Sequence, residues 1–507
     1  MEFFKQNDNI FSLFSLVQGN IKIEDDFSQD TLQQIKQLNI GIHAMNDFYV
    51  IVNGNEYNEK NYYVIYKPKS EELIEKNRAT LAKELYSLPV SEFVDYIEKL
   101  RQFFIDNEVS IRNAVLSLKM SWFLPILATI PYLLDSQGVI KAIEQELSGK
   151  EGAGVDYLDK WCTVDTTPYY GWQSEIRDSW GYNAPNTTPQ IRAFPTRQLH
   201  ITAGNSPHLP ILSLIRALSS KGAAVIKTPS EVIILATLLS VAMHSIAPNH
   251  AITRHTSFVY WQGGDNSVEN ALFEPYAFDR IVVWGSPSTV QSVKSRALYT
   301  KVICLNPRYG MSFIDLTKQD NESLEHIAHL ACTDSIISNQ KACTASLIHY
   351  VKGTEEQILQ YCRELQQALL KWDQKLSIPL PPATIGQIRL LQRKEFIQGT
   401  WFFNGSSRCP SSCVVYLPHS VDLTLHPQSR FIIVQRVSDS SELFAYLNES
   451  VSTIGIYPES ARIDLRDSIA AYGVSNILPL GQCERVYTGM PHDGMRILSE
   501  LCNWENS

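Results

Sequence analysis

One cysteine in this sequence has the surroundings that covalent chemistry requires. Cys343 lies in the segment DSIISNQKACTASLIHYV, residues 334–351, among small and polar residues and just before an apolar run. Lys341 precedes it by two residues, and a nearby ammonium group favours the thiolate over the thiol. A thiolate so placed can attack the carbonyl carbon of a thioester or an aldehyde. The alternative stays open, because one cysteine among nine is most often a small buried residue.

The elements that must position this cysteine form an alternating pattern of strands and helices. From Arg197 onward, LHITAG, AAVIK, TSFVYW, RIVVWG and KVICLN read as strands, and ILSLIRALSS and VIILATLLSVAMHSIA read as helices. After residue 307 the strands MSFIDL, SLIHYV, RFIIVQRV, VSTIGIYP and SNILPLG alternate with further helices. This alternation predicts an α/β fold with parallel sheets and crossover helices. The nearly continuous apolar runs are typical of strands that are covered on both faces.

The same patterns divide the chain into five segments. Before the alternation begins, FYVIVNG and NYYVIYKP read as strands and are followed by helical periodicity. A stretch rich in Gly, Trp, Thr and Pro then forms a long irregular connection. We therefore predict an α+β region at 1–150, an irregular connection at 151–196, α/β domains at 197–307 and 308–470, and a C-terminal segment at 471–507 that returns to the core or to an oligomer interface.

Composition limits the classes of function. The chain has 507 residues, of which 44% are hydrophobic and 19% charged, and this balance excludes intrinsic disorder. The net charge is −9 and no tract is rich in Lys or Arg, so a nucleic-acid partner is not expected. An odd number of scattered cysteines indicates a reducing compartment, and no targeting segment is evident, so we expect a cytoplasmic protein.

Several segments argue against other classes of protein. The P-loop, GxGxxG, HExxH and GxSxG motifs are absent. Cys409 and Cys413 lack a second pair of ligands at the spacing of a zinc site, so no metal is expected. The most apolar stretch, SWFLPILATIPYLL at 121–134, is too short to span a membrane and contains two prolines. We read it as a buried helix, with a surface for lipid or an acyl chain as the alternative.

Four segments together resemble the aldehyde dehydrogenase superfamily. NQKACTAS resembles its nucleophile segment, and LHITAGNSP, GAAVIKTPSE and DRIVVWGS follow the superfamily's order along the chain. RQLHITAGNSPHLPILSLIRALSSKGAAVIKT, AITRHTSFVYW and PHDGMRILSEL more closely resemble the acyl-CoA reductases typified by the fatty-acid reductase of bacterial luciferase operons. The resemblance covers roughly residues 197–500. It implies a Rossmann-type cofactor domain at 197–307 and a catalytic domain at 308–470.

The resemblance also implies roles for individual residues. Cys343 would accept the acyl group, and Asn205 would donate its amide to the oxyanion together with the backbone N–H of Cys343. The residues expected to bind the nicotinamide cofactor are Lys227, Ser230, Gly285 and Ser286. Each has an ordinary structural alternative: Asn205 as a turn residue, Lys227 as a solvated strand end, and Gly285-Ser286 as a strand-to-helix turn.

Two further positions bear on the direction of the reaction. Aldehyde-oxidising members of the superfamily carry a glutamate general base, and here Asn306 stands near that position. An amide cannot activate water as a base, so reduction of an acyl thioester is favoured over oxidation of an aldehyde. His492 is a candidate for proton transfer or for activation of the cysteine, whereas Asp493 could instead cap the helix that begins near MRILSEL.

The sequence as a whole predicts NADPH-dependent reduction of a long-chain fatty acyl thioester, acyl-CoA or acyl-protein, to a fatty aldehyde through an S-acyl-cysteine. NADH stays possible, because Glu231 would disfavour a 2′-phosphate near Lys227. An oxidative aldehyde dehydrogenase and a silent acyl-binding subunit of a reductase complex are the alternatives. The resemblance further implies an acyl-protein synthetase partner, a homo-oligomer formed through a β-arm, and a fate for the aldehyde in light emission or elsewhere.

Overall fold

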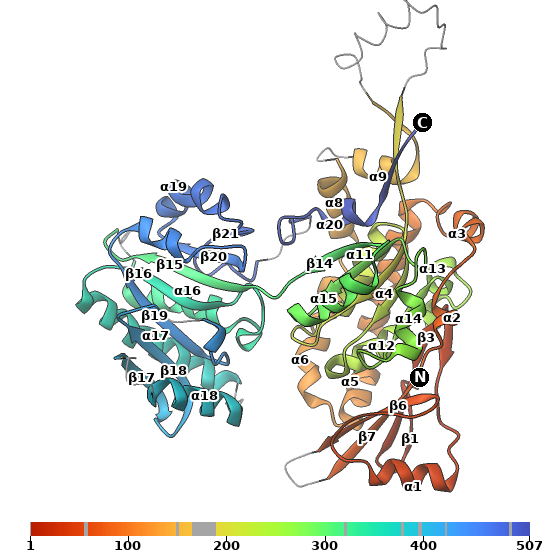
Figure 1. Cartoon of the computed structure of the whole chain (residues 1–507), viewed down its shortest axis with the longest axis horizontal. Helices are drawn as coiled ribbons and strands as arrows, with labels where there is room; N and C mark the ends of the chain where they lie inside the picture. Colours follow the sequence, from red (N-terminus) through yellow and green to blue (C-terminus); the bar gives the residue numbers. More distant parts are fainter. Residues whose placement is uncertain are drawn as a thin grey trace, which may run out of the picture. The chain divides into compact units, whose positions relative to one another are not determined.

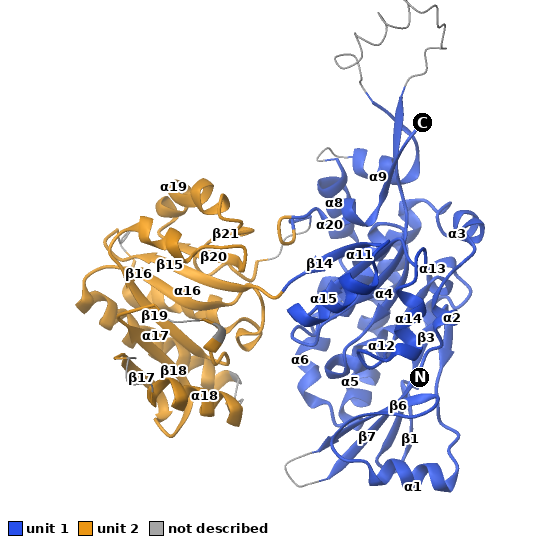
Figure 2. Cartoon of the chain, viewed as in Figure 1, with its two compact units in different colours: residues 1–306, 488–491, 495–507 blue, residues 307–487, 492–494 orange. Residues whose placement is uncertain are grey.

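The computed structural model describes residues 2–54, 59–148, 152–164, 189–318, 322–376, 380–393, 398–420, 423–485 and 489–507. The chain forms two compact units (Figure 2). Unit 1 contains residues 1–306, 488–491 and 495–507, and unit 2 contains residues 307–487 and 492–494. The division into five segments stays a prediction, and residues 165–188 of the expected irregular connection lie outside the described residues.

Unit 1 begins with a five-stranded sheet of order β1-β2-β7-β6-β5, drawn in red in Figure 1. Its central strands are rich in Tyr, Val and Ile, which fit a pleated, buried surface. Helix α1 covers one face through Ile35, and the other face joins the main core of the unit. These elements are β1 (Phe4–Asn7), β2 (Ile10–Leu13), α1 (Gln29–Gln37), β5 (Gly41–Ala44), β6 (Phe48–Gly54) and β7 (Lys60–Tyr66).

A layer of helices follows this sheet. Helix α4 buries Phe93, Ile97, Leu100 and Phe104, whose spacing gives it one apolar face. The helices are α2 (Ser70–Leu73), α3 (Arg78–Glu84), α4 (Val90–Asp106), α5 (Glu108–Ser117), η1 (Ser121–Phe123), α6 (Leu124–Leu127), α7 (Ile130–Leu133), α8 (Ser136–Leu147) and α9 (Ala153–Asp159).

The apolar stretch at 121–134 differs from the single buried helix that we expected. It forms three short helical pieces, because Pro125 and Pro131 lie in the first turns of α6 and α7, where the missing N–H is tolerated. Trp122 and Tyr132 are exposed, whereas Phe123 and Ile130 are buried. Among the described helices, none is long and apolar enough to cross a membrane alone; Ser121–Leu133 and Ser136–Leu147 would qualify only as a pair bent by 64°.

The second sheet of unit 1 has the order β14-β13-β10-β11-β12-β3-β4. The five strands from β14 to β12 are parallel, as the alternating pattern predicted, and β3 and β4 extend the sheet antiparallel. The strands are β3 (Ser15–Val17), β4 (Asn20–Lys22), β10 (Arg197–Ile201), β11 (Ala223–Lys227), β12 (Thr256–Val259), β13 (Arg280–Trp284) and β14 (Lys301–Leu305). The crossover elements are α11 (Leu209–Ser219), η2 (Ser230–Val232), α12 (Ile233–Ile246), α13 (Ala251–Arg254), α14 (Asn266–Leu272) and α15 (Pro287–Arg296).

A small antiparallel sheet, β22-β9-β8, brings the end of the chain back to unit 1. Its strands are β8 (Cys162–Thr163), β9 (Gln190–Phe194) and β22 (Asn503–Asn506), and α20 (Ile497–Leu501) precedes the last of them. The buried Glu146 of α8 accepts the backbone N–H of Leu498 at 2.7 Å. This carboxylate satisfies one of the free N–H groups in the first turn of α20.

Unit 2 is built on one sheet of order β17-β18-β19-β16-β15-β20-β21, parallel except for β17. Two apolar clusters cover its two faces. The strands are β15 (Tyr309–Asp315), β16 (Ser346–Lys352), β17 (Thr400–Ser406), β18 (Cys409–Leu417), β19 (Phe431–Val437), β20 (Val451–Tyr457) and β21 (Asn476–Pro479). The helices are α16 (Leu324–Ile336), η3 (Ile337–Gln340), α17 (Glu355–Leu376), α18 (Pro382–Arg393), η4 (Leu423–Leu425), η5 (Ser440–Tyr446) and α19 (Glu459–Ala470).

Candidate active site

In unit 1 the predicted cofactor residues gather at the carboxyl edge of the parallel sheet. Because β10 to β14 run in the same direction, their carboxyl ends share one edge. β11 lies on one side of β10 and β13 on the other, so the direction of chain progress reverses there. Ligands of open α/β sheets bind outside the carboxyl ends of the strands at such a reversal. The residues that follow these strand ends are Asn205, Lys227, Ser230, Gly285 and Ser286.

The turn after β13 leads directly into helix α15. Ser286 is the N-cap, and its Oγ accepts the N–H of Thr289 at 3.3 Å. A Cβ on Gly285 would lie 3.0 Å from the Cβ of Thr289, so a larger residue would have to displace that side chain. The segment is therefore an ordinary strand-to-helix turn, and it also exposes the positive end of a helix, to which phosphate groups bind.

Lys227 ends β11 between two aromatic rings. Its Nζ lies 5.7 Å from the ring centre of Tyr260 and 5.4 Å from that of Trp261. Burial lowers the pKa of Lys227 to about 8, and the carboxylates of Glu269 and Glu231 oppose that shift. Trp261 donates its Nε1–H to Glu269 at 3.0 Å. The ammonium group is thus held in a cage of aromatic faces rather than as the solvated strand end that was the alternative.

Glu231 joins the loops that follow β10 and β11. Ser230 donates its hydroxyl to Glu231 at 3.0 Å. A Cβ on Gly204 would lie only 2.7 Å from Oε2 of Glu231, so the carboxylate packs directly against that backbone. Asn205 is exposed in the same loop. Hydroxyl, carboxylate and ammonium groups beside a helix N-terminus match the ribose and phosphate groups of a dinucleotide, so these residues fit such a cofactor.

In unit 2 the nucleophile candidate, Cys343, lies at the amino edge of the parallel sheet rather than at the carboxyl edge. Cys343 precedes β16, so its turn lies at the amino ends of the parallel strands. Ser338, Asn339 and Gln340 have φ angles of 47°, 53° and 66°. Consecutive left-handed residues other than glycine are costly and persist only where the surrounding structure holds them.

Gln340 supplies the restraint on this turn. Its Nε2 donates to the carbonyl of Phe431 at 2.8 Å, and its Oε1 accepts the N–H of Phe431 at 2.9 Å. The paired bonds tie the turn to the start of β19. The neighbouring Arg430 forms a buried ion pair with Asp373 of α17 at 2.8 Å, which also anchors the start of β19. The glutamine before the cysteine is therefore a structural clamp.

The backbone around Cys343 is packed against β15. A hydrogen bond from the N–H of Ala345 to the carbonyl of Ala342, at 3.1 Å, closes the turn that contains the cysteine. Gly310 donates its N–H to the carbonyl of Ala345 at 3.0 Å. A Cβ on Gly310 would lie 2.6 Å from the carbonyl oxygen of Thr344. Only glycine leaves room for the turn in its present position.

The electrostatic surroundings of Cys343 differ from those that we expected. Burial and the charge of Asp493 raise the pKa of the thiol, whereas Ser452 and Arg308 lower it. Arg308 is a cation that lowers the pKa of the thiol, whereas the effect expected of the exposed Lys341 stays a prediction. Cys343 itself is half-buried.

Arg308 and Asp493 form an ion pair beside the cysteine. Nε of Arg308 lies 3.6 Å from Oδ1 of Asp493, and Nη1 donates to Ser475 at 3.1 Å. Asp493 does not cap the last helix, because α20 begins at Ile497 with Arg496 as its N-cap. His492 is half-buried and belongs to unit 2 with Cys343; its catalytic role stays a prediction. Sequence reasoning missed Arg308, because nothing local marks an arginine before a strand.

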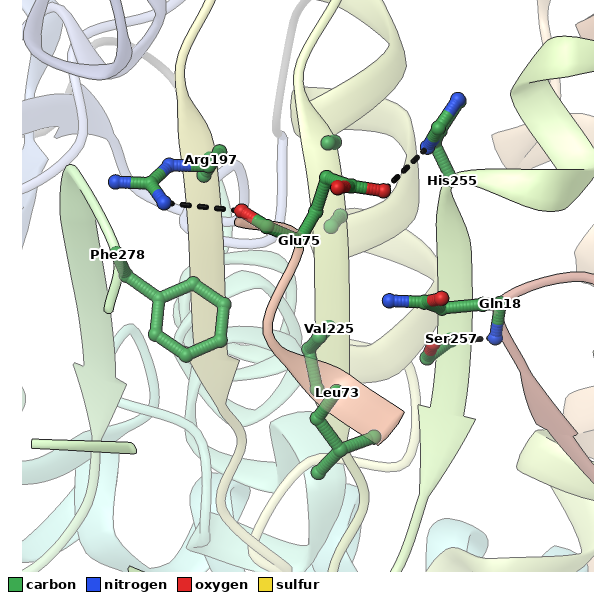
Figure 3. Close-up of a pocket in the computed structure, with 10 residues that line it drawn as sticks. Gln18, Leu73, Glu75, Arg197, Val225, His255, Ser257 and Phe278 are labelled. Atoms are coloured by element: carbon green, nitrogen blue, oxygen red, sulfur yellow. Dashed lines mark hydrogen bonds and ion pairs between the residues drawn. The ribbon is translucent and has the colours of Figure 1, made fainter. Parts of the chain in front are cut away.

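A separate narrow pocket lies at the amino edge of the unit 1 sheet, shown in Figure 3. Arg197 donates to the carbonyl of Glu75 at 3.0 Å and pairs with Asp279, and His255 lies 3.9 Å from the carboxylate of Glu75. The N–H of Gln18 binds the hydroxyl of Ser257 at 2.9 Å. The pocket's charged groups are thus engaged with one another, and these contacts hold the residues after β3 and after α2 against the sheet.

The expectation about metals concerns Cys409 and Cys413. Cys409 is exposed and Cys413 is buried in the same strand. His426 is buried, and its Nε2 lies 3.1 Å from the carbonyl oxygen of Leu347. In the described ranges, no three His, Cys, Asp or Glu side chains are arranged so that they could hold a metal ion.

Solved structures with this architecture include aldehyde dehydrogenases. Aldehyde dehydrogenase 21 from Physcomitrella patens, in complex with succinate, has a TM-score of 0.66 at 10% identity, covering 92% of this chain and 95% of its own. NADP-dependent glyceraldehyde-3-phosphate dehydrogenase from Bacillus halodurans, complexed with NADP, has a TM-score of 0.63 at 13% identity, covering 90% and 95%. The predicted aldehyde dehydrogenase-like fold is confirmed.

Sequence comparison defines the family within that fold. The model of the family "Acyl-CoA reductase (LuxC)" matches residues 173–504, and the chain belongs to this family. The long-chain acyl-protein thioester reductase of Photorhabdus laumondii is 24% identical over 347 residues, covering 65% of this chain and 67% of the relative. The enzyme of the same name from Vibrio harveyi is 24% identical over 346 residues, with the same coverage. The chain is therefore an oxidoreductase, and the resemblance read from its sequence is confirmed.

Proposed function

We propose that this enzyme reduces a long-chain fatty acyl thioester to the fatty aldehyde, with Cys343 as the acyl acceptor and NADPH as the reductant. The observation that carries the proposal is the clamped turn of Cys343, in a chain of the acyl-CoA reductase family. Strained backbone that is held by several independent contacts is typical of catalytic sites. The relatives named long-chain acyl-protein thioester reductase support the same substrate class.

The first step is acyl transfer to the cysteine. The thiolate of Cys343 attacks the thioester carbonyl, the new carbon–sulfur bond forms, and the bond to the CoA or carrier sulfur breaks. The departing thiolate takes up a proton and leaves as the free thiol. Because burial and Asp493 raise the pKa of Cys343, Arg308 and Ser452 have to stabilise the thiolate that attacks. Acyl transfer by such a thiol should therefore accelerate as pH rises.

The second step reduces the acyl-cysteine. When bound, the nicotinamide would supply the hydride for the acyl carbon. The thiohemiacetal oxyanion on Cys343 would then collapse to the aldehyde, with the carbon–sulfur bond broken and the cysteine sulfur leaving as thiolate. Lys227, Ser230, Gly285 and Ser286 would hold the cofactor at the carboxyl edge of the unit 1 sheet. The predicted oxyanion donors are the amide of Asn205 and the N–H of Cys343. An oxyanion donor is worth about 2.7–4 kcal/mol in comparable enzymes.

A second candidate function is oxidation of an aldehyde to the acid. The sequence offered only Asn306 near the expected general base, yet in unit 2 the carboxylate of Asp493 acts on Cys343. We infer that Asp493 is not a free base for water, because the Arg308 guanidinium is its ion-pair partner. The third alternative, a silent acyl-binding subunit, would accept an acyl group and oxidise no NADPH.

One pair of measurements tests the proposal. The full-length protein is incubated with radiolabelled tetradecanoyl-CoA, and NADPH oxidation is followed by absorbance while the product is identified. We expect covalent labelling, NADPH consumption and aldehyde release, and we expect all three to be lost in Cys343→Ala. Labelling that persists in that variant, or fatty acid as the main product, would overturn the assignment. Labelling without NADPH consumption would identify the silent subunit.

The remaining expectations extend this proposal. The acyl donor would be acyl-CoA or an acyl-protein handed over by a synthetase partner, and the enzyme would act as a homo-oligomer in the cytoplasm. The choice between NADPH and NADH depends on Lys227 and Glu231, since a 2′-phosphate is attracted by the first and repelled by the second. Rates measured with both nucleotides at equal concentration decide it.

A further inference from the structure

The loop that follows β12 is held by the N-terminal sheet. It contains Tyr260 and Trp261, the two rings around Lys227, and ends at Asp265. Tyr49 of β6 donates its hydroxyl to Oδ2 of Asp265 at 2.5 Å. Lys67, just after β7, pairs with the same carboxylate at 2.8 Å. Two consecutive strands of the first sheet thus fix one end of this loop.

Tyr49 is also connected to Lys227, through the ring of Tyr260. The ring of Tyr49 stands edge-to-face on that of Tyr260, with centroids 5.3 Å apart and planes at 89°. Tyr260 in turn lies against the ammonium group of Lys227. Tyr49 is fully buried, so its ring cannot move without the loop. Edge-to-face pairs are directional, and therefore the orientation of Tyr260 depends on Tyr49.

Asp265 also links Tyr49 to helix α14, which carries Glu269. It is the N-cap of α14, where its Oδ1 accepts the N–H of Ser267 at 3.0 Å. Helix α14 carries Glu269, which binds Trp261 and also acts on Lys227. A displacement at Tyr49 is therefore transmitted along two routes, through Tyr260 and through α14.

We propose that Tyr49 is a positioning residue for cofactor binding: the N-terminal sheet, through Tyr49, holds the aromatic cage that orients Lys227 toward the cofactor's adenosine end. This inference rests on the proposed function, and it gives the region at 1–150 a role in the nucleotide site. Because Tyr49 is fully buried and reaches Lys227 only through Tyr260, it would act on the cofactor indirectly. Its loss should weaken binding and leave the chemical step unchanged.

The test compares binding with turnover in the full-length protein. The Kd of NADPH is measured from the change in NADPH fluorescence, and kcat and KM are measured with tetradecanoyl-CoA. Tyr49→Leu removes the ring and the hydroxyl, and we expect the Kd and KM for NADPH to rise about two- to tenfold, the range for one aromatic pair. We expect kcat to stay within twofold. Tyr49→Phe keeps the ring and should restore most of the affinity.

Tyr63 provides the matched control. It lies in β7 of the same sheet and is equally buried, but its hydroxyl donates to the carbonyl of Leu118 at 2.7 Å, away from the loop. Tyr63→Leu should lower the melting temperature as much as Tyr49→Leu and leave the Kd of NADPH unchanged. An equal rise in Kd for both variants, or a fall in kcat at constant KM, would overturn the inference. A wild-type protein that binds no nicotinamide nucleotide would instead overturn the proposed function.

Discussion

The two units of this enzyme present their candidate residues at opposite edges of parallel sheets. In unit 1, Lys227 and Ser286 follow the carboxyl ends of β11 and β13, where open α/β sheets bind ligands. In unit 2, Cys343 and Arg308 precede β16 and β15, at the amino ends of the strands. A carboxyl edge offers helix N-termini as a ready-made site. An amino edge offers none, so the nucleophile's turn has to be held by contacts with strands that are remote in sequence, namely β19 and β15.

The largest effect that would sharpen this comparison is expected at Gly310. In Gly310→Ala the added Cβ would meet the carbonyl oxygens of Thr344 and Ala345 at 2.6 and 2.7 Å, which are backbone atoms that cannot swing aside. The turn of Cys343 has to move, and a displacement near 1 Å costs about 10²-fold in rate. We expect acyl labelling to slow by about that factor while the Kd of NADPH is unchanged.

Gly386 is the control for this substitution. It lies in α18 of the same unit, and a Cβ there would meet nothing within 4 Å. Gly386→Ala should preserve the rate of labelling and stabilise the helix by about 0.5–1 kcal/mol. Wild-type labelling by Gly310→Ala would show that the turn is adaptable, and the contrast between the two edges would then lose its basis.

A smaller effect is expected at the ion pair beside the cysteine. Asp493 raises the pKa of the Cys343 thiol and Arg308 lowers it. Asp493→Asn should therefore move the pH profile of iodoacetamide alkylation to lower pH, and Arg308→Met should move it to higher pH. At a pH below the pKa of the thiol, lowering that pKa by about one increases the thiolate fraction up to about tenfold. The rate at Cys343 is followed by mass spectrometry of the alkylated peptide.

Asp464→Asn serves as the charge control, because Asp464 is exposed in α19 of the same unit. It removes one negative charge and should leave the alkylation profile of Cys343 unmoved. If all three variants move the profile in the same direction, the local ion pair does not govern the thiol.

The smallest effect is expected at the carboxyl edge of unit 1. Glu231→Gln removes an exposed negative charge near Lys227 and beside Gly204. NADPH carries a 2′-phosphate that NADH lacks, so its affinity should improve about threefold relative to NADH, as is usual for one exposed charge. The ratio of Kd values is measured at pH 7, below the pKa of about 8 for Lys227, so that the ammonium group stays charged.

Glu274→Gln, at another exposed site of unit 1, changes the net charge equally and should leave the ratio of affinities unchanged. A ratio that falls in Glu231→Gln would mean that the carboxylate supports NADPH binding, and the electrostatic argument at this edge would fail.

The strands that position the unit 1 candidate residues could be predicted, because each strand and the residues after it lie in one short segment of the sequence. The segments LHITAG, AAVIK and RIVVWG form β10, β11 and β13, and each is followed at once by its candidate residues. The hairpin of β17 and β18 was missed, because CPSSC was considered only as a pair of metal ligands. The helix expected at 121–134 is broken, since its prolines begin new helical turns.

The surroundings of Cys343 could not be predicted in the same way. The groups that act on its thiol are Arg308, Ser452 and Asp493, which lie between 35 and 150 residues away along the chain. Lys341 was the local candidate, whereas Arg308, which lowers the pKa of the thiol, is 35 residues away along the chain. Sequence proximity could not reveal these groups, because they approach the thiol only when segments distant along the chain come together in the folded unit.

By itself, the sequence determined the α/β alternation, the family and the identity of the nucleophile candidate, because hydrophobic periodicity and residue order are properties of short segments. Only the tertiary structure decided which charged groups surround that nucleophile and which contacts support each site. Gln340 forms hydrogen bonds with the backbone of Phe431, Gly310 leaves room for the turn of Cys343, and Tyr49 packs against Tyr260 beside Lys227. Such contacts arise when distant strands pair, and charges act through space rather than along the chain.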